Sequence, residues 1–243
     1  MVSVPDFWKD DLDNGMKVIG TNYDEIPVVN LQLTINGGQT LDTNNPEKAG
    51  LASMTAAMMN ESTENYTAEE IQEELRKIGS TISVSAGDNS TSVSIRTLKK
   101  NMDRTMELAE EIMFRPAFAA QDFERLKKQQ IEGIQASYQD PASIASLVYS
   151  RLLYGDEHIK SVPASGIQET VERITLEDVK NFYASYFAPD VAELVVVGDV
   201  SKDEILGQLA FLQNWETKGV TIPDLPEAKN AKPARIYLVD KAQ

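Results

Sequence analysis

Residues 50–58 are Gly-Leu-Ala-Ser-Met-Thr-Ala-Ala-Met, and their pattern predicts a helix that carries Ser53 and Ala57 four residues apart. Side chains at that spacing share one face of a helix, so two histidines there could hold a metal ion while a neighbouring carboxylate polarised a bound water. In this chain the face offers only a hydroxyl and a methyl group. Alanine binds no metal, and zinc prefers histidine nitrogen, cysteine sulfur and carboxylate oxygen.

The whole sequence holds few donors for such a metal. It contains a single histidine, His158, and no cysteine. A conventional structural or catalytic zinc site cannot be assembled from that set of residues. We therefore expect this chain to bind no zinc and no other cofactor.

The hydroxyl of Ser53 is the remaining candidate for chemistry. A serine nucleophile needs an adjacent base to take its proton, and His158 belongs to a distant loop. A metal-free enzyme built on Ser53 is therefore disfavoured. Taken alone, residues 50–58 are typical of an amphipathic helix whose small residues allow close packing.

The composition limits the classes of partner. The chain has 243 residues, of which 42% are hydrophobic, so it can build a sizeable core. Its formal charge of -15 argues against nucleic acid or an anionic membrane, because both require clustered lysine and arginine. The charge would attract basic peptides or basic protein surfaces, although an acidic surface also serves solubility.

The sequence does not select one cellular compartment. No apolar run approaches the ~20 residues that cross a bilayer, and no signal pattern follows Met1. The lack of cysteine suits a reducing cytosol or a periplasm without disulfides. We expect a soluble protein of the bacterial periplasm or the cytoplasm, without membrane insertion.

Alternating apolar and polar residues mark the expected strands. The strongest signal is a hairpin in which two alternating segments flank the turn residues Gly87-Asp88-Asn89-Ser90. The pair Asn14-Gly15 is typical of a second turn, which leads into a strand. The strand segments are residues 12–19 with their turn, 28–35, 81–86, 91–96 and 192–198.

Caps and apolar periodicity indicate the helices. Pro46 stands where the first helix could begin. Thr67 and Glu70 form a capping box for a second helix, which Gly79 ends. The apolar stripe of the first helix consists of Leu51, Met54, Met58 and Met59. Further helices are expected over residues 99–114, 120–138, 141–154, 175–186 and 201–215.

The arrangement of these elements predicts an α+β fold, because hairpins and tight turns favour it over a parallel βαβ sheet. Residues 1–215 are expected to form one domain. Residues 216–233 contain three prolines and no helical period, which is typical of a linker. Residues 234–243 then begin a new strand. A lone strand is unstable, so we expect it to open a second, truncated domain.

Several short motifs resemble, in order and spacing, those of the M16 (insulinase, pitrilysin, mitochondrial processing peptidase) metallopeptidases. The resemblance covers most of the chain, and its motifs are specific in combination rather than singly. They are Asn14-Gly15-Met16-Lys17-Val18, Asn36-Gly37-Gly38, Gly50-Leu51-Ala52, Arg115-Pro116-Ala117-Phe118, Leu152 to His158, Gly166, and Leu194 to Asp199.

The resemblance implies the α+β fold that this family shares with LuxS-type hydrolases, a mixed and mainly antiparallel sheet with helices packed over it. It also sets Ser53, Ala56 and Ala57 at the His, Glu and second His of the family's zinc motif, H-x-x-E-H. A further glutamate ligand of the family corresponds to Glu132. The resemblance thus implies a degenerate zinc motif with Glu132 as its remnant, no catalytic or metal-binding residue, and unassigned substrate contacts.

In the family, two halves enclose an unfolded peptide, and one half carries zinc. The resemblance therefore implies that this chain is the first domain of a non-catalytic half. It would bind peptide beside a zinc-bearing half, on the same polypeptide or as a separate subunit, and zinc is expected only there. The alternative is a structural relative without proteolytic role, like the core proteins of the bc1 complex. His158 precedes Ile159-Lys160, where the family prefers Pro-Tyr, and is interpreted as a surface-loop histidine.

Overall fold

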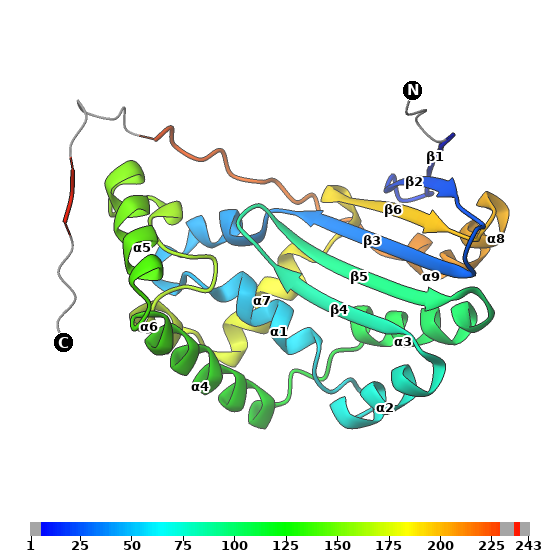
Figure 1. Cartoon of the computed structure of the whole chain (residues 1–243), viewed down its shortest axis with the longest axis horizontal. Coiled ribbons are helices and arrows are strands. Elements are labelled where there is room, and N and C mark those ends of the chain that lie inside the picture. The colour runs from blue at the N-terminus through cyan, green and yellow to red at the C-terminus, as the bar shows by residue number, and fades with distance from the viewer. Residues whose placement is uncertain (1–5, 229–235, 239–243) are drawn as a thin grey trace.

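A six-stranded sheet forms the centre of the computed structural model, which describes residues 6–228 and 236–238 (Figure 1). The strands lie in the order β1-β2-β6-β3-β5-β4. Neighbouring strands are antiparallel except β2 and β6, which are parallel. The expected mixed, mainly antiparallel sheet is confirmed. The strands are β1 (Trp8–Asp11), β2 (Lys17–Asn22), β3 (Val28–Asn36), β4 (Thr81–Ala86), β5 (Ser90–Leu98) and β6 (Ala192–Gly198).

Two tight hairpins agree with the turn chemistry of the sequence. In the first, β4 pairs with β5 so that Val84 lies opposite Val93. In the second, β1 pairs with β2, and Gly15 adopts a φ of 84° at the turn between them. A residue with a side chain would be strained at that φ, which explains the Asn-Gly pair. The strand β1, which precedes this turn, was not predicted.

The helices match most of the expected segments. Capping boxes begin α2 at Thr67, α7 at Thr175 and α8 at Ser201, because each hydroxyl accepts a backbone N–H that no helical carbonyl reaches. The α-helices are α1 (Leu51–Met59), α2 (Ala68–Ile78), α3 (Met102–Phe114), α4 (Ala120–Ser137), α5 (Pro141–Tyr154), α6 (Gln168–Arg173), α7 (Leu176–Tyr186), α8 (Lys202–Gln208) and α9 (Ala210–Gln213). Short 3₁₀ helices are Gly38–Asn44, Pro46–Lys48, Lys99–Asn101, Ile159–Ser161 and Pro189–Val191.

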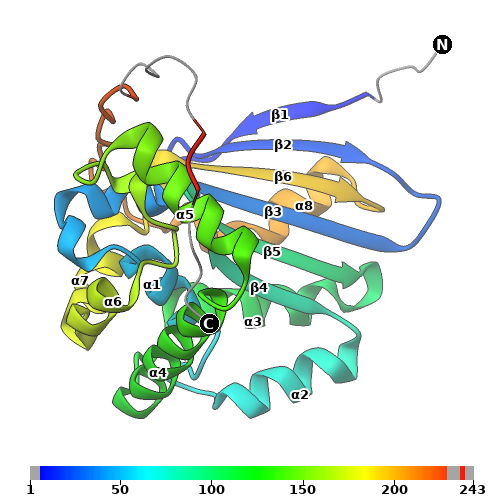
Figure 2. The same ribbon diagram turned by 60° about the vertical axis from the view of Figure 1, so that its left-hand side comes forward.

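Helices pack against one face of the sheet and leave the other face open (Figure 2). Strand β6 shows the division, because its residues alternate strictly between buried and exposed. Leu194 and Val196 point into the core and are each 1% exposed, whereas Val195 and Val197 on the opposite face are 37% and 38% exposed. One buried apolar cluster runs from Leu12 to Trp215 and joins the sheet to the helices.

The start of the first helix differs from the prediction. Pro46 lies in a separate 3₁₀ turn, and α1 begins only at Leu51. Gly50 separates the two, because its φ of 103° cannot continue a helix. A Cβ at Gly50 would also lie 2.8 Å from the backbone oxygen of Ser165. Glycine is thus required both by the turn and by the close approach of another loop.

Three further differences concern helix limits. The segment 99–114 begins with a 3₁₀ turn, and the α-helix starts at Met102. The segment 201–215 is divided into α8 and α9 at Leu209. The short helix α6 was not predicted, because its six residues are too few to show a clear period.

The segment expected to be a linker has neither helix nor strand over its described residues, 216–228. It nevertheless lies against the domain. The carboxylate of Asp190 accepts hydrogen bonds from the N–H groups of Lys218 and Gly219, at 2.8 and 3.0 Å. The strand expected over 234–240 falls mostly outside the described residues, so this strand and the proposed domain limits stay predictions.

Candidate functional site

The helix α1 carries the positions that the sequence singled out. It packs against β4, α4 and α7, and most of its side chains are buried. Ser53 and Ala57 lie on one face and are half-buried. The hydroxyl of Ser53 forms no hydrogen bond with any residue that the structure describes. This face therefore offers one hydroxyl and one methyl group, without a base beside the hydroxyl.

Ala56 faces the interior instead. It is 2% exposed and lines a cavity of about 20 Å³ together with Thr55, Met59 and Phe182. That space has room for about one water and not for a longer side chain. A carboxylate at this position would have to displace packed side chains.

Glu132 lies on α4, the helix that packs against α1. Its side chain is 60% exposed and forms an ion pair with Lys128, whose Nζ lies 3.8 Å away. The structure therefore brings the two helices together, but it shows no contact of the Glu132 carboxylate with Ser53 or Ala57. Over residues 6–228 and 236–238, no three His, Cys, Asp or Glu side chains are grouped to hold a metal ion.

The side chains on α1 do not fit a zinc ion. Zinc takes imidazole, thiolate or carboxylate ligands, and Ser53 and Ala57 supply none of these. A solvated glutamate on the neighbouring helix is a single ligand, and one ligand does not make a zinc site. The arrangement around α1 is a packed helix surface.

Asp42 is a buried acid that the sequence analysis did not identify. Its carboxylate caps the N-terminus of α1, where it accepts hydrogen bonds from the N–H groups of Gly50 at 3.0 Å and Ala52 at 3.2 Å. Burial raises the pKa of Asp42 to about 7, and these N–H bonds oppose the rise. No local pattern reveals this role, because Asp42 lies eight residues before Gly50 and reaches it through a loop.

The environment of His158 corrects its interpretation as a surface-loop histidine. The residue is 9% exposed, and its ring stacks on Tyr154 with the centroids 4.8 Å apart. Its Nδ1 accepts the backbone N–H of Lys160 at 3.0 Å, so Nε2 carries the proton and donates to the carbonyl oxygen of Pro226, also at 3.0 Å. His158 thus attaches segment 216–228 to the domain.

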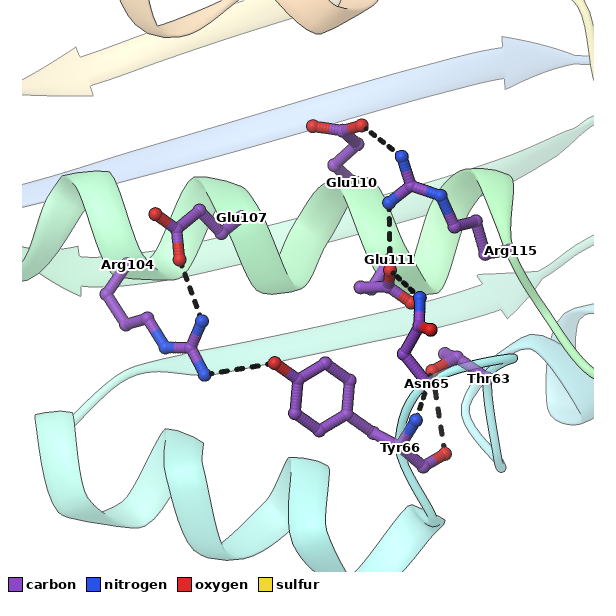
Figure 3. A network of polar contacts seen from close by, with 8 residues as sticks. All are labelled: Thr63, Asn65, Tyr66, Arg104, Glu107, Glu110, Glu111 and Arg115. Carbon is purple, nitrogen blue, oxygen red and sulfur yellow. Dashed lines mark hydrogen bonds and ion pairs between the residues drawn. The ribbon is translucent and has the colours of Figure 1, made fainter.

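A polar network joins the loop after α1 to the helix α3 (Figure 3). Glu111 is its centre, because its Oε1 accepts hydrogen bonds from Asn65 at 2.7 Å and Arg115 at 2.8 Å. Arg115 also donates to Glu110 at 2.8 Å. Arg104 pairs with Glu107 at the other end of the helix. The network holds the loop after α1 against the helix α3. Because each ionic group of the network already has a partner of opposite charge, the network is best explained as structural.

A groove of about 870 Å³ lies away from the predicted positions, between α4, α5 and the loop before α6. Ile134, Leu147 and Val162 contribute apolar walls. None of Ser53, Ala56, Ala57 and Glu132 lines it. No residue of α5 is fully buried, and Tyr149 is 65% exposed.

Two family models match the chain. The model described as Insulinase (Peptidase family M16) matches residues 17–160, and the model described as Peptidase M16 inactive domain matches residues 173–243. Among curated proteins, "Zinc protease PqqE" of Helicobacter pylori is 25% identical over 228 residues, which cover 90% of this chain and 50% of that protein. "Non-peptidase homolog YmxG" of the same organism is 24% identical over 194 residues, or 80% of this chain and 44% of that protein.

Solved structures show the same architecture. A peptidase M16 inactive domain from Pseudomonas fluorescens superposes with a TM-score of 0.83 at 25% identity, over 92% of this chain and 54% of that one. A protease from Helicobacter pylori superposes with a TM-score of 0.81 at 21% identity, over 92% of this chain and 55% of that one. The chain thus spans about half the length of the relatives that it matches.

Proposed function

Because this chain belongs to the insulinase (M16) family of peptidases, we propose that it is the non-catalytic part of a zinc metallopeptidase. In this proposal the chain encloses and binds peptide substrate beside a zinc-bearing half. That half is on the same polypeptide or on a separate subunit. Zinc and the chemistry of peptide hydrolysis belong to the partner half.

The observation that carries the proposal is the composition of α1. On the face where the family places metal ligands, the helix has Ser53 and Ala57, and Ala56 is buried beside a small cavity. The fold around the helix is intact, since the superposition on a solved M16 inactive domain covers 92% of the chain. An intact scaffold with these residues favours a role in binding or assembly over a role in hydrolysis.

The relatives support a non-catalytic role without deciding the partner. One is named as a non-peptidase homolog and another as a zinc protease, and those names apply to those proteins. A further solved chain, 18% identical with a TM-score of 0.77, is described as the first half of the periplasmic protease PqqL of Escherichia coli. A two-half arrangement for this chain is our extension of that architecture.

The cellular compartment of the protein is part of the proposal. None of the helices in the described segments combines the length and the apolarity that a membrane span requires. We propose the bacterial periplasm or the cytoplasm as its compartment. The formal charge of -15 favours substrates or partners with basic surfaces.

A reconstitution experiment tests the proposal. The full-length protein is combined with its zinc-bearing half, and cleavage of a fluorogenic unstructured peptide is compared with that by the zinc-bearing half alone. We expect cleavage to require both. A zinc-bearing half without its own general-base glutamate is the control for contaminating proteases. Equal cleavage without this chain would contradict the proposal and favour a structural relative without proteolytic role.

A further inference from the structure

The strand β4 forms one edge of the sheet (Figure 1). The side chain of Asn60 meets the middle of its outer edge. The backbone N–H of Val84 donates to Oδ1 of Asn60 at 2.8 Å. In return, Nδ2 of Asn60 donates to the carbonyl oxygen of Val84, also at 2.8 Å. Both main-chain groups of Val84 therefore point away from β5, to the side on which a further strand would lie.

Hydrogen bonds to the last turn of the helix α1 hold the Asn60 amide in this position. Its Nδ2 also donates to the carbonyl oxygen of Ala56 at 2.8 Å, in the last turn of α1. The backbone N–H of Asn60 bonds to the carbonyl groups of Ala57 and Met58, at the end of the same helix. The side chain thus has both N–H groups and its oxygen engaged, so it does not need to reorganise in order to occupy the strand edge.

An added strand could not avoid this position. Main-chain groups alternate in direction along a strand, so Ile82 and Ala86 face the same way as Val84. A strand of typical length, about five residues, would pair with all three positions, and Val84 is the middle one. It would run about 4.8 Å from β4, in the space that the Asn60 amide occupies.

We propose that Asn60 closes the β4 edge against extended peptides. An open edge presents unpaired N–H and C=O groups and is a template for an added strand. Asn60 supplies one donor and one acceptor, as a residue of an added strand would, and it is fixed to the chain's own helix. The inference goes beyond the proposed function and holds whether or not the chain encloses substrate. If it does, bound peptide contacts other surfaces of the domain.

The variant N60A tests the proposal in the full-length protein. The probe is a fluorescein-labelled peptide that copies residues 90–98, because β5 already pairs with the other side of β4. Fluorescence anisotropy measures its binding. We expect N60A to bind the probe at least about tenfold more tightly than the wild type, as one or two main-chain hydrogen bonds become available.

Two controls define the result. N65A is the matched variant, because it also removes an asparagine hydrogen bond from the loop after α1 but leaves the β4 edge unchanged. It should bind the probe as weakly as the wild type does. A probe with N-methyl groups on alternate residues cannot pair as a strand and should not bind N60A. Equal affinity of N60A and the wild type, or binding of the methylated probe by N60A, overturns the proposal.

If N60A does not fold, hydrogen exchange in the wild type tests the proposal instead. The amide of Val84 should exchange more slowly than that of Ile82, because Asn60 protects only the former. Equally fast exchange of the two amides overturns the proposal. Neither measurement involves the zinc-bearing half, so a failed reconstitution of cleavage leaves these results unaffected.

Discussion

The N–H of Gly50 donates to the carboxylate of Asp42 at 3.0 Å, and this bond fixes the place where the helix α1 begins. Asp42 is 1% exposed, so its carboxylate is almost completely removed from water. A helix N-terminus favours a negative charge, whereas burial disfavours it. Burial is the larger effect, and the pKa of Asp42 rises to about 7.

The pKa of Asp42 predicts a pH dependence of stability. Its folded pKa of about 7 lies above the ordinary value of 3.8, so the folded state keeps a proton that the unfolded chain releases. The contribution of Asp42 to the free energy of unfolding is therefore complete below its ordinary pKa, and it is lost as the pH rises towards 7. The isosteric variant D42N cannot titrate at this position.

We expect the free energy of unfolding of the wild type, relative to that of D42N, to fall as the pH rises from 4 to 7. The expected size is on the order of a few kcal/mol. Urea unfolding of both proteins across this range measures it. The comparison with D42N removes the opposite contributions of exposed, ion-paired acids. A difference that is constant or grows with pH would show that Asp42 is charged in the folded protein.

Ala56 and Ala57 should respond differently to the same substitution. A56E places a carboxylate where the free space is about 20 Å³, so we expect a loss of several kcal/mol in the free energy of unfolding. A57E changes a half-buried neighbour on the same helix and should cost clearly less. Urea unfolding at one pH measures both. Similar losses for the two variants would mean that Ala56 is less confined than its contacts indicate.

Zinc affinity should appear when the ligands are restored. The unmodified protein is expected to bind no stoichiometric zinc at low micromolar concentration, because α1 lacks imidazole and carboxylate ligands. S53H/A57H places two imidazoles on one half-buried face, and we expect weak zinc binding by calorimetry. No gain of affinity would show that this face is not accessible to a metal.

The contribution of Glu132 can be measured in the same background. Its carboxylate is 60% exposed and paired with Lys128, so E132Q in the S53H/A57H protein should leave zinc affinity almost unchanged. A loss of about tenfold or more would mean that Glu132 turns towards α1 once metal is bound, as a third ligand would. K128A, which frees Glu132 without removing it, is the matched control.

His158 should affect the segment 216–228 more than the domain. H158A removes the donor to the carbonyl of Pro226 and the acceptor for the N–H of Lys160. We expect limited proteolysis within 216–228 to become several-fold faster, because opening of the segment no longer has to break the hydrogen bond between His158 and Pro226. K160A leaves the backbone N–H in place and serves as the control. Unchanged proteolysis of H158A would show that the contacts of Lys218 and Gly219 hold the segment without His158.

Local features of the fold were predictable because neighbouring residues determine them. The hydroxyl of Thr67 accepts the N–H of Glu70, and the Glu70 carboxylate accepts the N–H of Thr67, so this capping box is complete within four residues. The hairpin of β4 and β5 is likewise specified by alternation on both sides of one turn. The mixed sheet followed from such hairpins and from the family resemblance.

Features that depend on distant residues were not predictable. Part of the need for glycine at position 50 comes from the close approach of Ser165, which lies far away in the chain. His158 is buried because a later segment crosses it, and the carbonyl oxygen of Pro226 in that segment accepts a hydrogen bond from its Nε2. Asn60 was not identified either, since nothing in its own segment shows that its amide meets the β4 edge. The zinc-motif positions came from the family resemblance, and their roles stay predictions.

The position of β6 also constrains how the protein is made. This strand lies between β2 and β3, so it joins the hairpin of β1 and β2 to the remaining three strands. During synthesis on the ribosome, residues 192–198 emerge long after their neighbours. Until then the two parts of the sheet expose unpaired inner edges, which favour aggregation, and closing such long-range pairs is slow. The nascent chain therefore remains vulnerable until nearly the whole domain has been translated, and chaperones that shield strand edges should increase its yield.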